Sequence, residues 1–309
     1  MNPNKTILRV CPVRICWNGR DGQNLKGHIY NYNHTLDGQT WHPLYGDVAP
    51  QILNLNMGAP FQPFSRAPQI RYRYKTGDIQ ITGAALWQSQ YLSQGPEGKS
   101  QKYIKNSCVP EIYAGIDYKH KGLLIGAGIE MVSLTPRTQA TVEDKIYKVS
   151  ERITSLSYEV HMKYNSEKWL VAAKSVLGSN LTQTSMLGGY GIKSIDPRTG
   201  EQEYSPNRNS SSWINIVYGK TWKPAIFFGY MKNLGTSDAV TNMYGTGTNV
   251  DQLLSGTAEL TYNVPHWKLG VEYNLTSAWY GSLNHSNGKV VDTHSVSNNR
   301  LVATALFMF

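Results

Sequence analysis

Residues 301–309, LVATALFMF, end the chain on alternating apolar side chains and an aromatic last residue. Leu301, Ala303, Ala305, Phe307 and Phe309 occupy every second position, so in a β-strand all five share one face. The ends of soluble domains are usually polar and frayed. This stretch therefore predicts a strand whose apolar face needs an apolar neighbour at the very end of the chain.

Composition favours strands over helices in the whole chain. Only 17% of the 309 residues are charged, whereas 28 are glycine and 20 are tyrosine. The longest apolar candidate run, 122–132, contains Glu130, so no helical membrane span is encoded. The net charge is +9, but the basic residues are scattered, and nucleic-acid binding would need them gathered on one face. We expect no nucleic-acid partner.

From residue 25 onward, alternating segments are joined in turn by short and by long connections. At 156–164, for example, Leu156, Tyr158 and Val160 share one face, and Glu159 and His161 share the other. The short connections, each containing or adjoining an aromatic residue, lie at 74–78, 118–122, 164–168, 221–225 and 262–267. The long polar connections lie at 93–109, 135–152, 179–210, 233–252 and 281–299.

These segments give roughly thirteen strands of about 9 to 14 residues, near the length that a tilted strand needs to cross a bilayer. Two of them, at 25–34 and 36–45, precede a longer loop. In a soluble sandwich, the loops at both ends have comparable lengths. In an outer-membrane barrel, turns are short at one end only and aromatic residues gather at the interfaces. The pattern predicts an all-β, antiparallel transmembrane barrel over 25–309, with Phe307 and Phe309 at its aromatic rim.

The terminal strand resembles that of bacterial outer-membrane barrels, which ends in phenylalanine. More narrowly, GQTWHPLYGD at 38–47, followed by NMGAPFQPFSRAPQIRYRY at 56–74, resembles a segment of porins of the DcaP-like, dicarboxylate-channel type. There, a strand with GQTW leads to a loop rich in proline and phenylalanine and then to a strand that starts PQIR. The resemblance implies a sixteen-stranded homotrimer in outer-membrane lipid, inserted by the barrel-assembly machinery through its C-terminal strand.

The order of the turns predicts that further strands belong upstream. The last strand follows a long loop and so runs toward the periplasm, and counting back makes the strand at 25–34 run the same way. A chain that enters from the periplasm would need an odd number of strands before it, and three would restore sixteen. No secretory signal is visible at the amino terminus. We therefore expect an amino-terminally truncated porin whose residues 1–24 are a non-barrel or non-native tail.

The polar faces of the strands would line a hydrated lumen, where charges need no pairing. The predicted pore-lining residues are Arg71, Arg73, Lys75, Glu111, Asp117, Glu130, Glu159, His161, Lys163, Lys174, Glu259, Glu272 and Arg300. These charges either simply keep the wall wet, or Arg71, Arg73 and Lys75, spaced two residues apart, form an anion-attracting ladder. The positive net charge supports the second interpretation weakly.

The segment 46–65 is a long loop with its own apolar residues, which indicates that it packs against another part of the protein. By resemblance it would fold into the pore and narrow it, with Pro60, Phe61, Pro63, Phe64 and Arg66 at the constriction. A surface loop or a trimer-contact loop is the alternative.

Catalytic and metal-binding interpretations find little support in the sequence. Ser157, Glu159 and His161 share a face, but in a strand they stand about 7 Å apart, too far for direct hydrogen bonds. Cys11, Cys16 and Cys108 are an odd number without C-x-x-C spacing, and the histidines are scattered. We expect no enzyme activity, cofactor or metal.

The sequence thus predicts passive diffusion of small hydrophilic solutes across an outer membrane, with a weak preference for anions. Two alternatives remain open. One is a soluble or surface β-rich module that binds glycans through exposed tryptophan and tyrosine. The other is a structural or adhesin barrel with a plugged lumen.

Overall fold

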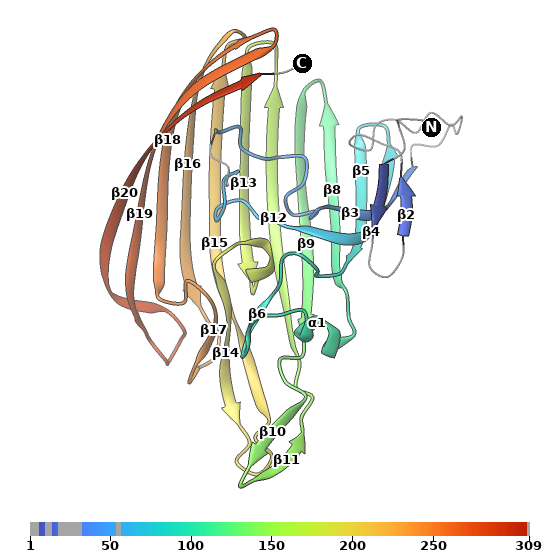
Figure 1. The fold of residues 1–309 in the computed structure, drawn as a ribbon, viewed down its shortest axis with the longest axis vertical. Coiled ribbons are helices and arrows are strands. Elements are labelled where there is room, and N and C mark those ends of the chain that lie inside the picture. Colours follow the sequence, from blue (N-terminus) through green and yellow to red (C-terminus); the bar gives the residue numbers. More distant parts are fainter. Residues whose placement is uncertain (1–5, 10–13, 18–32, 54–56, 308–309) are drawn as a thin grey trace.

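The computed structural model describes residues 6–9, 14–17, 33–53 and 57–307, with side chains described from residue 38 onward. Its main feature is an antiparallel sheet of long strands that curves round an interior crossed by loops (Figure 1). The long strands are β3 (Asn33–Trp41), β4 (Arg66–Thr76), β5 (Ile79–Leu86), β8 (Glu111–His120), β9 (Leu123–Leu134), β12 (Ile153–Asn165), β13 (Trp169–Ser179), β15 (Gln202–Tyr218), β16 (Trp222–Gly235), β18 (Val250–Val264), β19 (Trp267–Leu283) and β20 (Val290–Phe307).

These strands pair in chain order from β3 to β20, and two further strands bring the sheet to 14. The two are β14 (Gly188–Ile195) and β17 (Met243–Thr246), which extend the sheet beside β15. The smaller elements are the hairpin of β1 (Thr6–Arg9) and β2 (Arg14–Trp17), β6 (Gln94–Gly95), β7 (Gly98–Lys99), α1 (Lys102–Ser107), the hairpin of β10 (Gln139–Val142) and β11 (Lys145–Lys148), and η1 (Thr182–Thr184). Among the described residues, no helix is both long and apolar enough to cross a bilayer.

Short turns and long connections lie at opposite ends of the sheet, as the sequence predicts. The turns that follow β8, β12 and β15 lie at the top of Figure 1, whereas β10, β11, β14 and β17 lie toward the bottom. Tight turns demand glycine at two of the short connections. Gly122 and Gly219 have φ of +83° and +99°, and a Cβ at either would collide with a carbonyl oxygen, of Asn165 and Trp222 respectively.

Strand boundaries differ from the prediction at both ends of the chain. β3 runs without a break from Asn33 to Trp41 and pairs residue by residue with β4, so the turn expected at residue 35 does not exist. Nine neighbouring residues find backbone partners on β4, and a turn would break that ladder. The rest of the strand predicted at 25–34 lies outside the described residues, and twelve long strands remain on the main path.

Three of the predicted long loops contain the beginning of a long strand of the main sheet. β15 begins at Gln202, β18 at Val250 and β20 at Val290, all inside segments that the polar composition assigned to loops. Pairing continues there because backbone amides need hydrogen-bond partners whether or not the side chains are apolar. The connection between β19 and β20 is therefore much shorter than the predicted 281–299.

The two faces of the strands differ: many large apolar side chains point outward, whereas the inward face carries carboxylates together with a buried apolar cluster around Phe61, Trp213 and Phe227. Val160 is 56% exposed and Leu301 is 72% exposed, whereas Glu272 is fully buried and Glu159 is nearly so. A soluble protein buries its apolar side chains and leaves its carboxylates in water. The reversal matches a sheet whose outer face meets an apolar solvent.

Exposed aromatic rings form a row beside the short turns. Trp169 packs on Tyr218 with ring centroids 4.6 Å apart, and Trp267 packs on Phe307 at 5.0 Å. Both pairs are cross-strand neighbours at the short-turn end. Such rings suit a lipid–water interface, where an apolar body meets a polar surface. Phe307 lies in this row, and its position at a lipid–water interface stays a prediction; Phe309 lies outside the described residues.

Candidate pore wall and inner segment

In the connection from β3 to β4, residues 42–53 and 57–65 lie against the inner face of the sheet, and we call them the inner segment. Ser211 Oγ on β15 donates to the carbonyl oxygen of Phe61 at 3.0 Å. Trp213 Nε1, two residues further along the same strand, donates to Gln62 Oε1 at 2.9 Å. The Phe61 ring packs over Gly229 on β16, where a Cβ would lie 2.7 Å from the ring. Both ring packing and hydrogen bonds therefore fix this part of the inner segment to the wall.

A second set of contacts fixes residues 51–53. The backbone N–H of Leu53 donates to Glu259 Oε2 at 2.9 Å and to Glu272 Oε2 at 2.7 Å. Glu259 and Glu272 are register partners on β18 and β19. The backbone N–H of Gln51 donates to Asn215 Oδ1 at 2.8 Å. Carboxylates on the strands thus satisfy backbone donors that the segment could not pair by itself.

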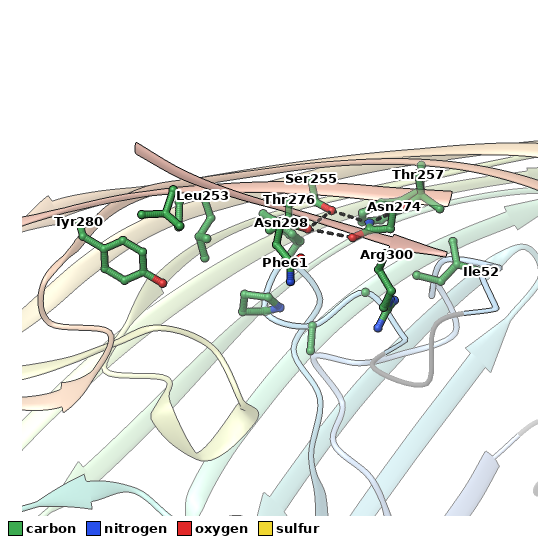
Figure 2. Close-up of a pocket in the computed structure, with 16 residues that line it drawn as sticks. Ile52, Phe61, Leu253, Ser255, Thr257, Asn274, Thr276, Tyr280, Asn298 and Arg300 are labelled. Carbon is green, nitrogen blue, oxygen red and sulfur yellow. Dashed lines mark hydrogen bonds between the residues drawn. The ribbon is translucent and has the colours of Figure 1, made fainter. Parts of the chain in front are cut away.

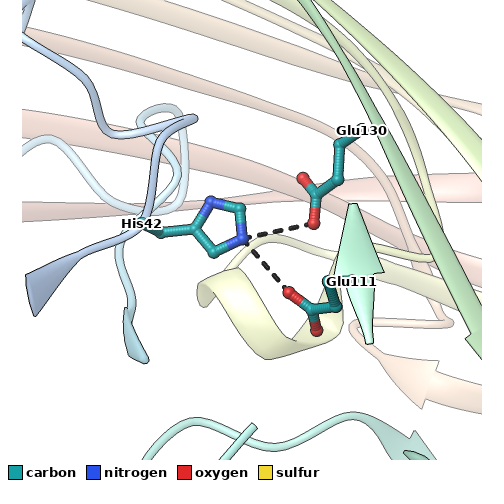
Figure 3. Close-up of side chains that lie close together, drawn as sticks. All are labelled: His42, Glu111 and Glu130. Atoms are coloured by element: carbon teal, nitrogen blue, oxygen red, sulfur yellow. Dashed lines mark hydrogen bonds and ion pairs between the residues drawn. The ribbon is translucent and has the colours of Figure 1, made fainter. Parts of the chain in front are cut away.

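His42 joins two glutamates from neighbouring strands at the start of the inner segment (Figure 3). Its Nε2 lies 3.2 Å from Glu111 Oε2 and 3.2 Å from Glu130 Oε1, and all three side chains are buried. Gln88 Nε2 donates to the other oxygen of Glu111, and Gln183 Nε2 donates to Glu130 at 3.4 Å. The imidazole therefore acts as the shared donor between two buried carboxylates.

Protonation of His42 is favoured by this arrangement. Burial by itself lowers the pKa of His42, but the charge of Glu130 and the hydrogen bonds to both carboxylates raise it to about 9. A contact of 3.2 Å from the N–H of Leu44 to His42 Nδ1 favours the neutral ring. The contact from Leu44 stabilises the neutral ring less than the two buried carboxylates stabilise the charged ring. The imidazolium is therefore the form expected at neutral pH.

The same three residues are the ones in the described chain that could hold a metal. Their ligand atoms lie within 4.8 Å of one another. In this structure, however, the Nε2 proton of His42 occupies the position between the carboxylates, and a metal would have to displace it. The absence of a metal thus stays a prediction.

Two buried cations bind backbone carbonyls, one at the start of the inner segment and one at the end of β3. Lys174 Nζ on β13 donates to the carbonyl oxygens of Leu44 and Tyr45 at 2.6 and 2.9 Å. Arg71 Nη2 on β4 donates to the carbonyl oxygen of Trp41 at 2.6 Å. The expectation that wall charges stay hydrated and unpaired is wrong for these residues. The inner segment supplies the partners of Lys174, whereas Arg71 bonds to Trp41 at the end of β3 and to Gln69 on its own strand.

A further network lies on β8 and β12. His161 lies 3.0 Å from Asp117 Oδ1 through Nε2 and 2.9 Å from Glu159 Oε2 through Nδ1, and Tyr113 donates to Glu159 at 3.0 Å. The prediction that Glu159 and His161 are too far apart to bond is wrong, since long side chains lean along a strand and close the gap between their Cα atoms. Ser157 bonds a backbone carbonyl instead, so it supplies no nucleophile to this network.

The predicted basic ladder meets three different environments. Arg71 is buried against Trp41, Arg73 Nη2 lies 3.8 Å from Asp47 Oδ1, and Lys75 is exposed near the short turn. Of the other predicted wall residues, Lys163 is half-buried on β12, and Arg300 Nη2 lies 3.6 Å from Glu272 Oε1.

The predicted constriction residues fall into two groups. Phe61 and Pro63 are buried within the inner segment, and Pro60 is half-buried. Phe64 packs edge-on against Trp41 at 5.0 Å. Arg66 does not belong to the loop: it is the first residue of β4, and its guanidinium lies 4.2 Å over the Trp41 ring. Residue 66 pairs with residue 41 in register, which is why the strand begins there.

Asp47 ties the inner segment to the wall near the short turns. Lys119 Nζ donates to Asp47 Oδ2 at 2.9 Å. Burial alone would raise the pKa of Asp47, but the charges of Lys119 and Arg73 lower it below the ordinary 3.8. Such a group stabilises the folded state above its unfolded pKa, and this stabilisation is lost as the pH falls through the lower folded value.

We therefore expect acid to loosen the inner segment around Asp47. Lowering the pH from 7 to 3 should speed limited proteolysis of the inner segment, by up to about fivefold for a half-exposed ion pair. The Asp47→Asn variant should be cleaved faster than wild type at pH 7. Its rate of proteolysis should then rise less than that of wild type when the pH is lowered to 3. An identical acid response in the variant would show that Asp47 is not the responsible group.

Comparison with known proteins shows the fold of the chain but does not assign it to a family. Neither a protein-family model nor a curated protein sequence matches the chain. Among solved structures, the chain is similar to outer-membrane-expressed OmpT of Vibrio cholerae, with a TM-score of 0.52, 11% identity, and coverage of 90% of this chain and 78% of that one. For OmpT folded in vitro, the TM-score is 0.51 at 10% identity, with 90% and 77% coverage. A trimer form of that protein gives 0.50 at 10% identity, with 90% and 78% coverage.

These similarities define the class of the protein. The chain has the all-β, antiparallel barrel fold of outer-membrane proteins, as the alternation, the turns and the aromatic row already indicate.

Proposed function

We propose that the chain forms an outer-membrane channel through which small hydrophilic solutes diffuse passively. The observation that carries this proposal is the reversed distribution of its side chains, with apolar residues such as Val160 outside and carboxylates such as Glu272 inside. An apolar exterior suits lipid, and a polar interior suits water and dissolved solutes. Passive diffusion asks for no catalytic group and no cofactor.

Several finer features extend this proposal. We propose that the inner segment narrows the passage, because Phe61 and Gln62 are fixed to the wall well inside the sheet. A homotrimer in outer-membrane lipid is supported by the trimer form of the similar OmpT. Insertion by the barrel-assembly machinery through the C-terminal strand is proposed from the aromatic end of that strand. We also propose a weak preference for anions, because the net charge of the chain is +9.

Planar-bilayer recording tests the channel directly. The purified full chain, reconstituted from detergent, should give stepwise current in KCl, and a salt gradient should give a reversal potential shifted toward that of chloride. Flotation with liposomes provides the control for insertion. Protein that floats with lipid but passes no current would indicate a plugged barrel instead. Protein that stays monomeric in plain buffer without detergent would indicate a soluble binding module.

A further inference from the structure

A cavity of about 480 Å³ lies between the inner segment and the inner face of β18, β19 and β20 (Figure 2). Ile52 and residues 58–61 form one side. The strands supply the other, with side chains that point into the space from three neighbouring strands. Its volume falls in the range of ordinary small-molecule sites.

The strand side of the cavity is a row of neutral hydrogen-bonding groups. Asn274 Nδ2 donates to Ser255 Oγ at 2.9 Å and to Thr257 Oγ1 at 2.7 Å. Thr276 Oγ1 donates to Asn274 Oδ1 at 3.0 Å. Asn298, on the next strand, also lines the cavity. Hydroxyls and amides both donate and accept, so this row can exchange its internal bonds for bonds to a solute hydroxyl.

The rest of the lining is mostly apolar, with the hydroxyl of Tyr280 and a single charged side chain. Pro60 and Phe61 face the row from the inner segment, and Leu253 lies beside it. Arg300 is the charged residue that lines the cavity, and Glu272 lies 3.6 Å from its guanidinium. An anionic solute that approached the guanidinium would therefore have to compete with the carboxylate of Glu272.

We propose that this cavity is a binding position for uncharged, hydroxyl-rich solutes of sugar or polyol type, on the path of the channel proposed above. A sugar ring has hydroxyls at its edge and C–H groups on its faces, which matches a hydrogen-bonding row opposite proline and phenylalanine. A carboxylate solute would have to compete with Glu272 for Arg300, and an ammonium solute would face Arg300 itself. A purely apolar solute would leave the hydroxyl row without water or partners.

The test is block of the single-channel KCl current by three solutes of one size: glucose, gluconate and glucosamine. Glucose should reduce the current in a saturable way, whereas gluconate and glucosamine at equal concentration should give at least about threefold weaker block, because neither finds an unpaired opposite charge. Thr276→Val keeps the volume of the side chain and removes one hydroxyl. It should raise the glucose concentration for half-block by about threefold to tenfold, which is the effect expected from the loss of one hydrogen bond.

The matched control is Thr304→Val, on β20 but outside the cavity lining. It should leave both the KCl current and the glucose block within about twofold of wild type. Flotation of each variant with liposomes shows that it folds and inserts. Normal current with no glucose block, or with stronger block by gluconate, overturns this inference alone. No current at all from inserted protein overturns the proposed channel and the inference together.

Discussion

Replacing Val160 by arginine is expected to destabilise the membrane-inserted protein by about 2–4 kcal/mol, the cost of a cation on the lipid face near the middle of a barrel wall. Val160 points outward from β12 and is 56% exposed. Tyr164, an exposed aromatic residue beside the short turn that follows β12, lies four residues further along, about 13 Å at the rise of a strand. An arginine at Val160 would thus stand well inside the apolar band.

Ile146→Arg is the matched control, because Ile146 is also apolar and 70% exposed but lies in the β10–β11 hairpin at the far end of the sheet. It should change the free energy of unfolding by less than about 0.5 kcal/mol, as ordinary surface substitutions do. Urea unfolding from lipid vesicles, followed by tryptophan fluorescence, measures both variants. Equal and small effects would mean that the outward face of β12 does not meet hydrocarbon.

Replacing His42 by alanine is expected to cost about 3–5 kcal/mol, the penalty for breaking a buried charge pair. The variant leaves the carboxylates of Glu111 and Glu130 buried and without the donor that they share at 3.2 Å. Because His42 begins the inner segment, we expect that segment to lose protection first. Hydrogen exchange of that segment should accelerate, and the channel current should rise.

Two controls separate this effect from a general loss of histidine. His120→Ala removes a half-exposed partner of Asp78, and it should cost less than about 1 kcal/mol. His42→Ala combined with Glu130→Gln removes one of the two stranded charges, so the double variant should recover part of the loss. If both histidine variants behave alike, the buried cluster does not anchor the inner segment.

The pH dependence of the same cluster has a defined sign. The folded pKa of His42, about 9, lies above the ordinary 6.5, so its stabilisation is complete below pH 6.5 and is lost as the pH rises through 9. Wild type should therefore show faster exchange of the inner segment above pH 9, and His42→Ala should not gain this alkaline increase. An unchanged alkaline increase in the variant would assign it to another group.

Much of the fold follows from local rules in the sequence. The alternation at 156–164 correctly places Val160 outside and Glu159 inside, and the aromatic residues beside the short turns correctly mark one rim. The predicted turn at residue 35 is wrong, because nine residues pair with β4 across it. The loops at 179–210, 233–252 and 281–299 are too long for the same reason: backbone pairing continues where side-chain alternation fades.

The site was less predictable than the fold. His42, Gln62 and Trp213 carry the anchoring of the inner segment, yet none stands among the predicted site residues. Glu111, Glu130 and Lys174 were correctly placed on the polar face, but the inner segment buries them, so they are not the hydrated charges that were expected. The composition of the loop, rich in proline and phenylalanine, indicates that it packs against another part of the protein. It does not indicate which side chains it contacts.

Periodicity by itself determined which side of each strand is apolar, because side chains alternate strictly across a pleated backbone. The tertiary structure alone decided which polar residues meet. The partners of His42 lie 69 and 88 positions away, and their contact depends on the register of strands and on the path of a segment that crosses the interior. Contacts of that kind depend on distances in space, which a local pattern of residue types does not encode.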